Sequence, residues 1–197
     1  MRVILASKSP RRREILEMLG VRFEIISADA DEHSEERNPA ALVTELSLRK
    51  GRAVRDLLAA EGEWNKDTLI IASDTVVAAD GQILGKPTDE NDAARMLRML
   101  SGSTHEVLSG VALLCGDREL AAAERTGVVF SDMSENDIAW YVSSGEPADK
   151  AGAYAVQGLA SLFIKGLEGD YFNVVGLPVF RLNQLTKELL GRTLTEL

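Results

Sequence analysis

Short apolar runs alternate with helix-like segments along this chain, and the alternation limits the folds that it can adopt. Residues 2–6 (RVILA) and 68–72 (TLIIA) are rich in aliphatic and β-branched side chains, which is typical of buried strands. Each run is followed by residues that favour turns or helix starts. Because two predicted hairpins interrupt a strict strand–helix repeat, the pattern predicts an α/β fold with a mixed central sheet.

The other elements are predicted from hydrophobic periodicity and from helix start and stop signals. Predicted helices cover residues 9–20, 39–60, 88–100, 134–145 and 179–190. Ser134 with Asp137 three residues on resembles a capping box at the start of the fourth helix. Predicted strands cover 21–26, a hairpin at 76–84 that turns at Asp80 and Gly81, two runs within 105–130, and a pair that turns at Gly169 and Asp170. The segment 146–158 is expected to be irregular.

Composition indicates one folded domain over residues 1–197. The chain has 197 residues, of which 45% are hydrophobic, enough for one sizeable core. Its net charge of -9 argues against a nucleic-acid partner, because proteins that follow a phosphate backbone need a basic surface. No stretch approaches the roughly 18 apolar residues that span a bilayer, so no membrane association is expected. The single cysteine, Cys115, is predicted to be a buried, inert thiol and favours a reducing, cytoplasmic location.

Three consecutive arginines at the start of the first predicted helix are an electrostatic anomaly. Arg11, Arg12 and Arg13 lie where unpaired backbone N–H groups already carry partial positive charge, so each should disfavour the helix by about 0.3 to 1 kcal/mol. Placed after a buried strand, they suit a multiply charged anion such as a polyphosphate. The alternative is three solvated surface arginines.

Other candidate residues follow along the chain. Asp74 comes directly after the 68–72 run, where it could hold a divalent cation or accept a proton from water, or could be a turn residue. Lys86 stands on a Gly-Pro-restricted turn and suits phosphate, although an ordinary surface lysine would look the same. The acidic cluster 29–32 could add an oxygen ligand or be a solvated loop. Gln157 carries the donor and acceptor needed to read a nucleobase edge, although a lone loop glutamine is more often structural.

Several familiar chemistries lack support. The stretch 81–87 is one residue short of a Walker A loop and has Pro87 where Ser or Thr should bind magnesium. His33 and His105 stand singly, without a spacing that favours zinc. Neither a nucleophile elbow nor a dinucleotide fingerprint is present.

Taken together and in order, these motifs resemble the Maf family of nucleoside triphosphate pyrophosphatases, relatives of the inosine triphosphate pyrophosphatases. The resemblance covers essentially the whole chain. Its markers are LASKSPRRREIL at 5–16, ASDTVV at 72–77, GKPTD at 85–89, MLxxLSGxxH at 96–105, DKAGAYAVQG at 149–158 and NVVGLP at 173–178. It implies a twisted central sheet flanked by helices, with a deep cleft between two lobes.

The resemblance also implies an activity: a hydrolase that cuts a nucleoside triphosphate between its α- and β-phosphates, with a divalent metal. Carried over residue by residue, the proton acceptor is Asp74 and the metal-side acid is Glu32, so both acids are metal candidates. The phosphate-contacting residues match Ser7, Arg11, Arg12, Lys50 and Lys86. The subfamily acting on dTTP and UTP is matched by the specificity residues Arg11, Thr75 and Gln157. Gly51 departs from the family's usual alanine, which puts the local helix in doubt.

The expected mechanism is positioning and charge stabilisation. Asp74 and Glu32 are expected to hold magnesium or manganese, with cobalt also acceptable to oxygen ligands, while the cationic residues stabilise the departing pyrophosphate. Two alternatives stay open: a nucleotide-sensing regulator linked to cell-division arrest, and a house-cleaning enzyme for purine nucleotides or 7-methyl-GTP. Family members are often homodimers, and neither the oligomeric state nor the physiological nucleotide, normal or modified, follows from the residues.

Overall fold

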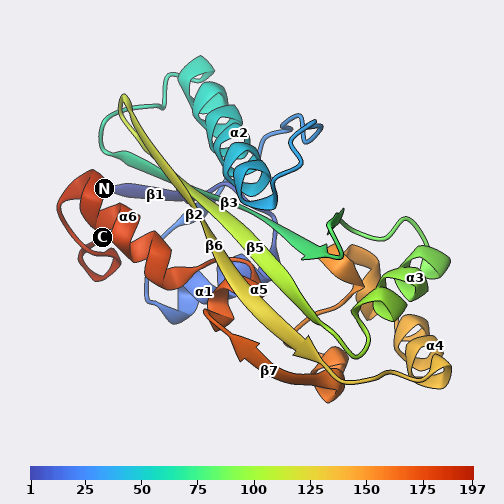
Figure 1. Cartoon of the computed structure of the whole chain (residues 1–197). Coiled ribbons are helices and arrows are strands. Elements are labelled where there is room, and N and C mark those ends of the chain that lie inside the picture. Colours follow the sequence, from blue (N-terminus) through green and yellow to red (C-terminus); the bar gives the residue numbers. More distant parts are fainter. The chain divides into compact units, whose positions relative to one another are not determined.

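The computed structural model describes residues 1–197, which form two compact units (Figure 1). Unit 1 consists of Met1–Asp74, Ser109–Glu124 and Gly176–Leu197, and unit 2 consists of Thr75–Leu108 and Arg125–Val175. The chain passes from one unit to the other within three long strands, β3 (Thr68–Ala79), β5 (Thr104–Cys115) and β6 (Arg118–Phe130). The strand order is β2-β1-β3-β5-β6-β7, with β4 paired to β3. Parallel and antiparallel pairs both occur, which confirms the predicted α/β class with a mixed sheet.

Unit 1 is built on a short parallel arrangement. Its other elements are β1 (Arg2–Leu5), α1 (Pro10–Met18), β2 (Glu24–Ile25), α2 (Pro39–Ala60) and α6 (Val179–Leu190). Strand β1 pairs in parallel with both β2 and β3, and its residues Arg2 to Leu5 lie opposite Thr68 to Ile71. In Figure 1, α2 covers one side of this part of the sheet, and α1 and α6 lie on the other.

Alternate residues of the strands form the core under α2. Side chains two apart point to the same face of a strand, and this face packs against the apolar stripe of the helix. The buried members of this cluster are Ile4, Ala6, Val54, Leu58, Ile70, Ala72, Ala112 and Leu114. The helix is therefore held along its length by unit 1's own strands.

Two glycines allow α2 to lie this close to the sheet. A Cβ added at Gly110 of β5 would meet the carbonyl oxygen of Val43 at 2.0 Å, so backbone touches backbone there. A Cβ added at Gly51 would meet Leu114 Cδ1 at 2.5 Å. Helix α2 runs unbroken through Gly51, so the expected local doubt about the helix is not borne out. The missing methyl instead makes room for Leu114.

Unit 2 surrounds a separate core. Its further elements are β4 (Gln82–Leu84), α3 (Glu90–Leu100), α4 (Glu135–Ser143), β7 (Ile164–Glu168) and α5 (Tyr171–Val175), with three short 3-10 segments at Glu146–Asp149, Ala151–Ala153 and Leu159–Phe163. The cluster includes Leu97 and Leu100 from α3, Phe130 from β6 and Tyr141 from α4, all buried. The predicted capping box is confirmed, since the Ser134 side chain and Asp137 cap the start of α4 reciprocally. The predicted hairpin turn is also confirmed, with positive φ at Asp80 and Gly81.

Three sequence predictions about secondary structure are wrong. The strand expected at 21–26 shrinks to Glu24–Ile25. Asp74 does not follow a strand that ends at residue 72, because β3 continues to Ala79 and buries Ser73 and Asp74 inside it.

The third error is the strand pair expected around Gly169 and Asp170. Strand β7 ends before that turn, and the chain then enters α5. The Asp170 carboxylate accepts from the backbone N–H of Phe172 at 2.8 Å, which caps the helical turn. The stretch expected to form the second strand of this pair is therefore helical.

Two further expectations concern single features. Cys115 is half-buried rather than buried, and its Sγ donates to the carbonyl of Lys66 at 3.3 Å. Burial raises the pKa of this thiol. None of the helices combines the length and the apolar character needed to cross a bilayer.

Candidate active site

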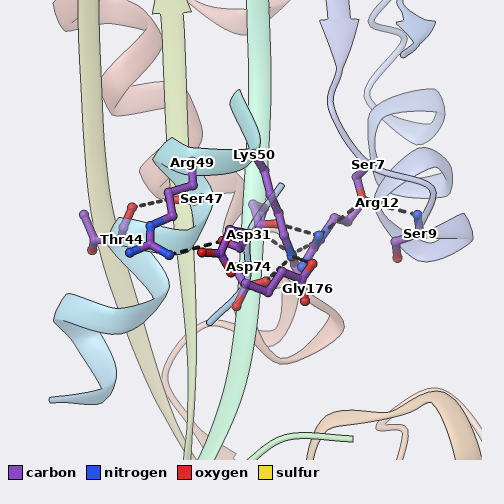
Figure 2. A network of polar contacts seen from close by, with 12 residues as sticks. Ser7, Ser9, Arg12, Asp31, Thr44, Ser47, Arg49, Lys50, Asp74 and Gly176 are labelled. Atoms are coloured by element: carbon purple, nitrogen blue, oxygen red, sulfur yellow. Dashed lines mark hydrogen bonds and ion pairs between the residues drawn. The ribbon is translucent and has the colours of Figure 1, made fainter. Parts of the chain in front are cut away.

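Five of the predicted site residues lie together in unit 1, where four different elements meet. Ser7 follows β1, Arg12 belongs to the first turn of α1, Lys50 projects from α2 and Asp74 lies within β3. Figure 2 shows the side chains of Arg12, Lys50 and Asp74 directed toward one another. The fifth residue, Glu32, comes from the segment 26–38, which has no helix or strand.

Lys50 joins the two predicted acids. Its Nζ lies 2.9 Å from Glu32 Oε1 and 2.5 Å from Asp74 Oδ1. The side chain of Asp74 is 12% exposed and that of Glu32 is 66% exposed. One ammonium therefore balances a nearly buried carboxylate and an exposed one at the same point.

Arg12 braces the backbone beside Asp74. Its Nε donates to the carbonyl of Gly176 at 2.8 Å, and its Nη1 donates to the carbonyl of Ser73 at 2.6 Å and to Ser7 Oγ at 3.2 Å. Burial lowers the pKa of the Arg12 guanidinium, and the nearby Asp74 opposes this shift. Ser73 Oγ donates to the same Gly176 carbonyl at 2.9 Å.

The three arginines of α1 separate into different environments. Arg12 points into the unit, whereas Arg13 is exposed and pairs with Glu17 one turn along at 3.0 Å. Arg11 is half-buried. The first turn contains no acid and Ser9 makes no side-chain cap, so the positive end of α1 is left without a neutralising residue of its own. This is the electrostatic setting that the sequence predicts for an anion.

The remaining predicted residues belong to unit 2. Thr75 follows Asp74 in β3 and is half-buried. Lys86 is exposed just after β4. Gln157 is exposed between two short 3-10 segments. Their predicted roles toward phosphate and base remain predictions.

The loop that carries Gln157 is held by a hydrogen-bond network centred on the buried Tyr141. Tyr141 Oη donates to Glu146 Oε1 at 2.7 Å and accepts from the backbone N–H of Ala155 at 3.3 Å. Glu146 Oε2 also accepts from the backbone N–H of Leu159 at 3.0 Å. Burial first, and the contact with Glu146 second, raise the pKa of Tyr141. These contacts fix the backbone on both sides of Gln157.

The acids of unit 1 are compatible with a divalent cation. Glu32 and Asp74 already converge on a single positive charge, that of Lys50. Magnesium in enzymes is commonly held by one or two carboxylates together with substrate phosphates, rather than by a complete cage of protein ligands. The chain has no group of three or more His, Cys, Asp or Glu side chains arranged to hold a metal. The residues therefore fit a metal that arrives with a phosphate ligand.

Sequence reasoning missed three contributors to this cluster. Ser73 and Gly176 supply the carbonyl groups that hold Arg12, and Arg49 contacts the segment around Glu32. Contacts to backbone carbonyls leave no spacing pattern. The ASDTVV and NVVGLP markers include Ser73 and Gly176, but neither marker gave these residues a role, and Arg49 lies in none of the markers.

Comparison with known proteins gives a consistent result. A relative from Symbiobacterium thermophilum, named dTTP/UTP pyrophosphatase, is 47% identical over 184 residues, which cover 93% of this chain and 91% of the relative. Relatives of the same name from Geobacillus sp. and Bacillus cereus are 47% and 44% identical over 188 residues, or 95% of this chain. Among solved structures, the Staphylococcus aureus Ham1 protein aligns with 67% of this chain at 12% identity and a TM-score of 0.48.

The family model described as Maf-like protein matches residues 2–189, which is nearly the whole chain. The match therefore includes every residue of the cluster around Lys50 and the loop that carries Gln157. On this match and on the identity to the relatives above, the chain belongs to the Maf-like protein family.

Proposed function

We propose that this chain hydrolyses dTTP and UTP, or modified pyrimidine nucleotides of the same kind, to the monophosphate and pyrophosphate. The observation that carries the proposal is the convergence of Glu32 and Asp74 on Lys50 beside the cationic start of α1. The name shared by relatives 43–47% identical over most of the chain supports the choice of substrate.

The triphosphate is bound by cations and by a helix start. Ser7, Arg11, Arg12, Lys50 and Lys86 are the proposed phosphate-binding residues. Arg12 holds Ser7 through its Oγ, so the hydroxyl has a fixed position at the end of β1. Donors placed before the reaction stabilise negative charge on the departing pyrophosphate without reorganising during the step.

Asp74 is the proposed general base. It accepts a proton from the water that attacks the α-phosphorus. The neighbouring Ser73 is fixed twice, through its carbonyl by Arg12 and through its hydroxyl by Gly176, which orients the backbone that carries Asp74. A base held this way keeps its direction toward the water, which matters because rate depends on near-attack geometry.

Glu32 and Asp74 are the proposed ligands of a magnesium or manganese ion, with cobalt as an acceptable substitute. Such an ion supplies charge neutralisation of phosphate oxygens and a more acidic bound water. When the two carboxylates hold a dication, the Lys50 ammonium is available to a phosphate oxygen.

Arg11, Thr75 and Gln157 are the proposed residues for base selection. An amide side chain both donates and accepts, as a pyrimidine edge requires. Two competing assignments can be distinguished from this one by experiment: a nucleotide-sensing regulator, and an enzyme for purines or 7-methyl-GTP. The second would hydrolyse its own nucleotides faster than UTP or dTTP. A regulator would bind triphosphate without turnover.

The testing experiment is a substrate panel with product identification. UTP and dTTP with magnesium should yield pyrophosphate and the monophosphate, with higher kcat/KM than CTP, GTP or 7-methyl-GTP. Asp74→Asn should lower kcat by about 10²- to 10⁴-fold, the range for loss of a general base. Asp67→Asn, an exposed aspartate just before β3, is the matched control and should keep wild-type activity. Release of inorganic phosphate with the diphosphate, or full activity in Asp74→Asn, would refute the assignment.

We further propose a single domain over residues 1–197, a homodimer and a cytoplasmic location. One cooperative unfolding transition would support the first, and light scattering at micromolar concentration tests the second. Fractionation of cells that express the tagged chain tests the third.

A further inference from the structure

The segment that carries Glu32 is held in place by side-chain contacts, since it has no secondary structure of its own. Residues 26–38 form neither helix nor strand, and most residues from 31 to 38 are exposed. Ile26 and Ala28 pack against the core under α2, but from residue 31 onward apolar packing contributes little. The contacts that the structure gives to residues 31–36 are polar.

We infer that Arg49 is a positioning residue for Glu32, an inference that rests on the proposed function of that acid. The guanidinium of Arg49 donates from Nη1 to the carbonyl oxygens of Asp31 at 3.2 Å and of His33 at 2.6 Å. These are the residues immediately before and after Glu32. Arg49 thus holds the backbone on both sides of the acid.

Arg49 and Lys50 divide the task between two consecutive positions of α2. Figure 2 shows both side chains leaving the helix, with Arg49 joined to Asp31 and Lys50 directed to Asp74. Lys50 contacts the Glu32 carboxylate, while Arg49 contacts the backbone around it. The side chain of Glu32 and the backbone around it are therefore both held by residues of the same helix.

Arg49 is itself oriented by a neighbour on the same face of α2. Its Nη2 forms an ion pair with Glu45, one turn earlier. The second oxygen of Glu45 accepts from Ser34 Oγ at 3.0 Å, so the same pair also holds the far end of the turn. Ser34 Oγ accepts in turn from the backbone N–H of Glu36 at 3.1 Å.

The chemistry of this position requires a guanidinium. Several donors fixed in one plane let Arg49 contact two carbonyls and a carboxylate at once. A lysine could keep the ion pair with Glu45, but its single nitrogen cannot hold all three partners in the same geometry. The Arg49→Lys variant therefore separates the effect of the positive charge from the effect of positioning the segment.

The activity experiment compares Arg49→Ala, Arg49→Lys and Arg52→Ala. Arg52 also lies on α2, and it pairs with Glu119 away from the Glu32 segment, so its removal deletes the same charge from the same helix. Arg49→Ala should lower kcat for UTP roughly 10-fold and raise the magnesium concentration for half-maximal rate, as losses of outer partners of metal ligands do, with little change in KM for UTP. Arg49→Lys should recover only part of the rate, and Arg52→Ala should match the wild type.

A double-mutant cycle with Glu32→Gln tests whether Arg49 acts through Glu32. If it does, Arg49→Ala should cause no further loss in the Glu32→Gln background. An equal fold-loss in both backgrounds, or full activity in Arg49→Lys, would overturn the inference, since either would mean that Arg49 acts by charge or through the helix.

Hydrogen–deuterium exchange gives a readout that does not depend on turnover. Amides of residues 31–36 should exchange about fivefold faster or more in Arg49→Ala and at the wild-type rate in Arg52→Ala. Unchanged exchange in Arg49→Ala would overturn the inference even if activity falls. If the wild type fails to hydrolyse UTP, the proposed function fails by itself, and exchange still decides whether Arg49 holds this segment.

Discussion

Two long irregular segments that carry predicted site residues, 26–38 and 146–163, are held by different physical means. In unit 1, residues 26–38 present Glu32 and are tied to α2 by partly exposed charged groups, chiefly Glu45 and Arg49, whose side chains are 38% and 33% exposed. In unit 2, residues 146–163 present Gln157 and are organised by 3-10 turns and by the buried Tyr141 with its half-buried partner Glu146. Each segment is fixed within its own unit.

Both segments position a site residue, but the contacts that hold them differ in how much they contribute to folding free energy. Exposed ionic contacts contribute little to folding free energy, typically 0 to about 1 kcal/mol each, yet they can still orient a charged side chain. Buried hydrogen bonds cost more when broken, because a desolvated group is left without a partner. The acid should therefore be easy to misplace without unfolding the chain, whereas the glutamine should not.

The largest expected contrast is in activity. Glu32→Gln should lower kcat about 10²-fold or more on every nucleotide, because it removes a proposed ligand of the dication that would neutralise the phosphate oxygens. Gln157→Ala should instead reduce the preference for UTP over CTP by about 10-fold and leave the metal dependence unchanged. Steady-state kinetics on both nucleotides measures the two effects. An equal loss of activity on UTP and CTP in Gln157→Ala would contradict the separate role proposed for the second segment.

The next contrast is in acid sensitivity. Burial lowers the pKa of His105 to about 4, and His105 Nε2 lies 2.8 Å from the hydroxyl of Tyr154 in the second segment. Because the folded pKa is below the unfolded value, the unfolded chain binds the proton more tightly. Neutral His105 therefore makes its full contribution to the unfolding free energy above pH 6.5. This contribution, up to about 3 kcal/mol, is lost as pH falls toward 4.

Urea unfolding between pH 4 and 7.5 tests this, with His105→Gln as the comparison. Between pH 6.5 and 4, the unfolding free energy of the variant should depend less on pH than that of the wild type. Parallel profiles for the two proteins would show that His105 does not titrate in this way.

A smaller effect is expected from the hydroxyl of Tyr141. Tyr141→Phe leaves the N–H of Ala155 and the carboxylate of Glu146 each short of a partner, which should cost about 1 to 3 kcal/mol of unfolding free energy. Tyr171→Phe, at a residue 41% exposed on α5, is the matched control and should change stability by less than about 0.5 kcal/mol. Equal effects in the two variants would contradict the assigned network.

The smallest effect concerns the exposed segment. Ser34→Ala removes one contact to Glu45 and should cost no more than about 0.5 kcal/mol. Raising the salt concentration from about 0.05 to 0.5 M should speed amide exchange at 31–36 and leave 153–160 unchanged, because salt screens exposed charges far more than buried dipoles. Exchange measured by mass spectrometry on both peptides decides this, and similar salt responses would remove the contrast.

Much of the fold could be predicted because its signals are local. The capping box at Ser134 and the turn at Asp80 and Gly81 depend on residues adjacent in sequence, and both were predicted correctly. The short helix after Gly169 was not predicted, and a strand was expected in its place. Its first turn is stabilised by the Asp170 carboxylate, which accepts a hydrogen bond from the backbone N–H of Phe172. Strand β3 was predicted too short because Ser73 looks like a break, although Gly176 accepts its hydrogen bond inside the unit.

The candidate site was predictable as a set of residues but not as a set of contacts. Lys50 had no distinguishing local pattern and entered only through the family resemblance. Its contact with both acids depends on the path of the irregular segment that carries Glu32, which no periodicity describes. Arg12 was expected to face a phosphate, and the structure adds that two of its nitrogens already hold main-chain carbonyls.

The close approach of Gly110 to Val43 gives this enzyme candidate a weak point at a residue outside its proposed catalytic and binding groups. Helix α2 carries both Arg49 and Lys50, and its distance from β5 is set where backbone meets backbone. Any larger residue at position 110 must push the whole helix outward and carry both cations with it. Loss-of-function variants should therefore be found at a glycine that makes no contact with nucleotide.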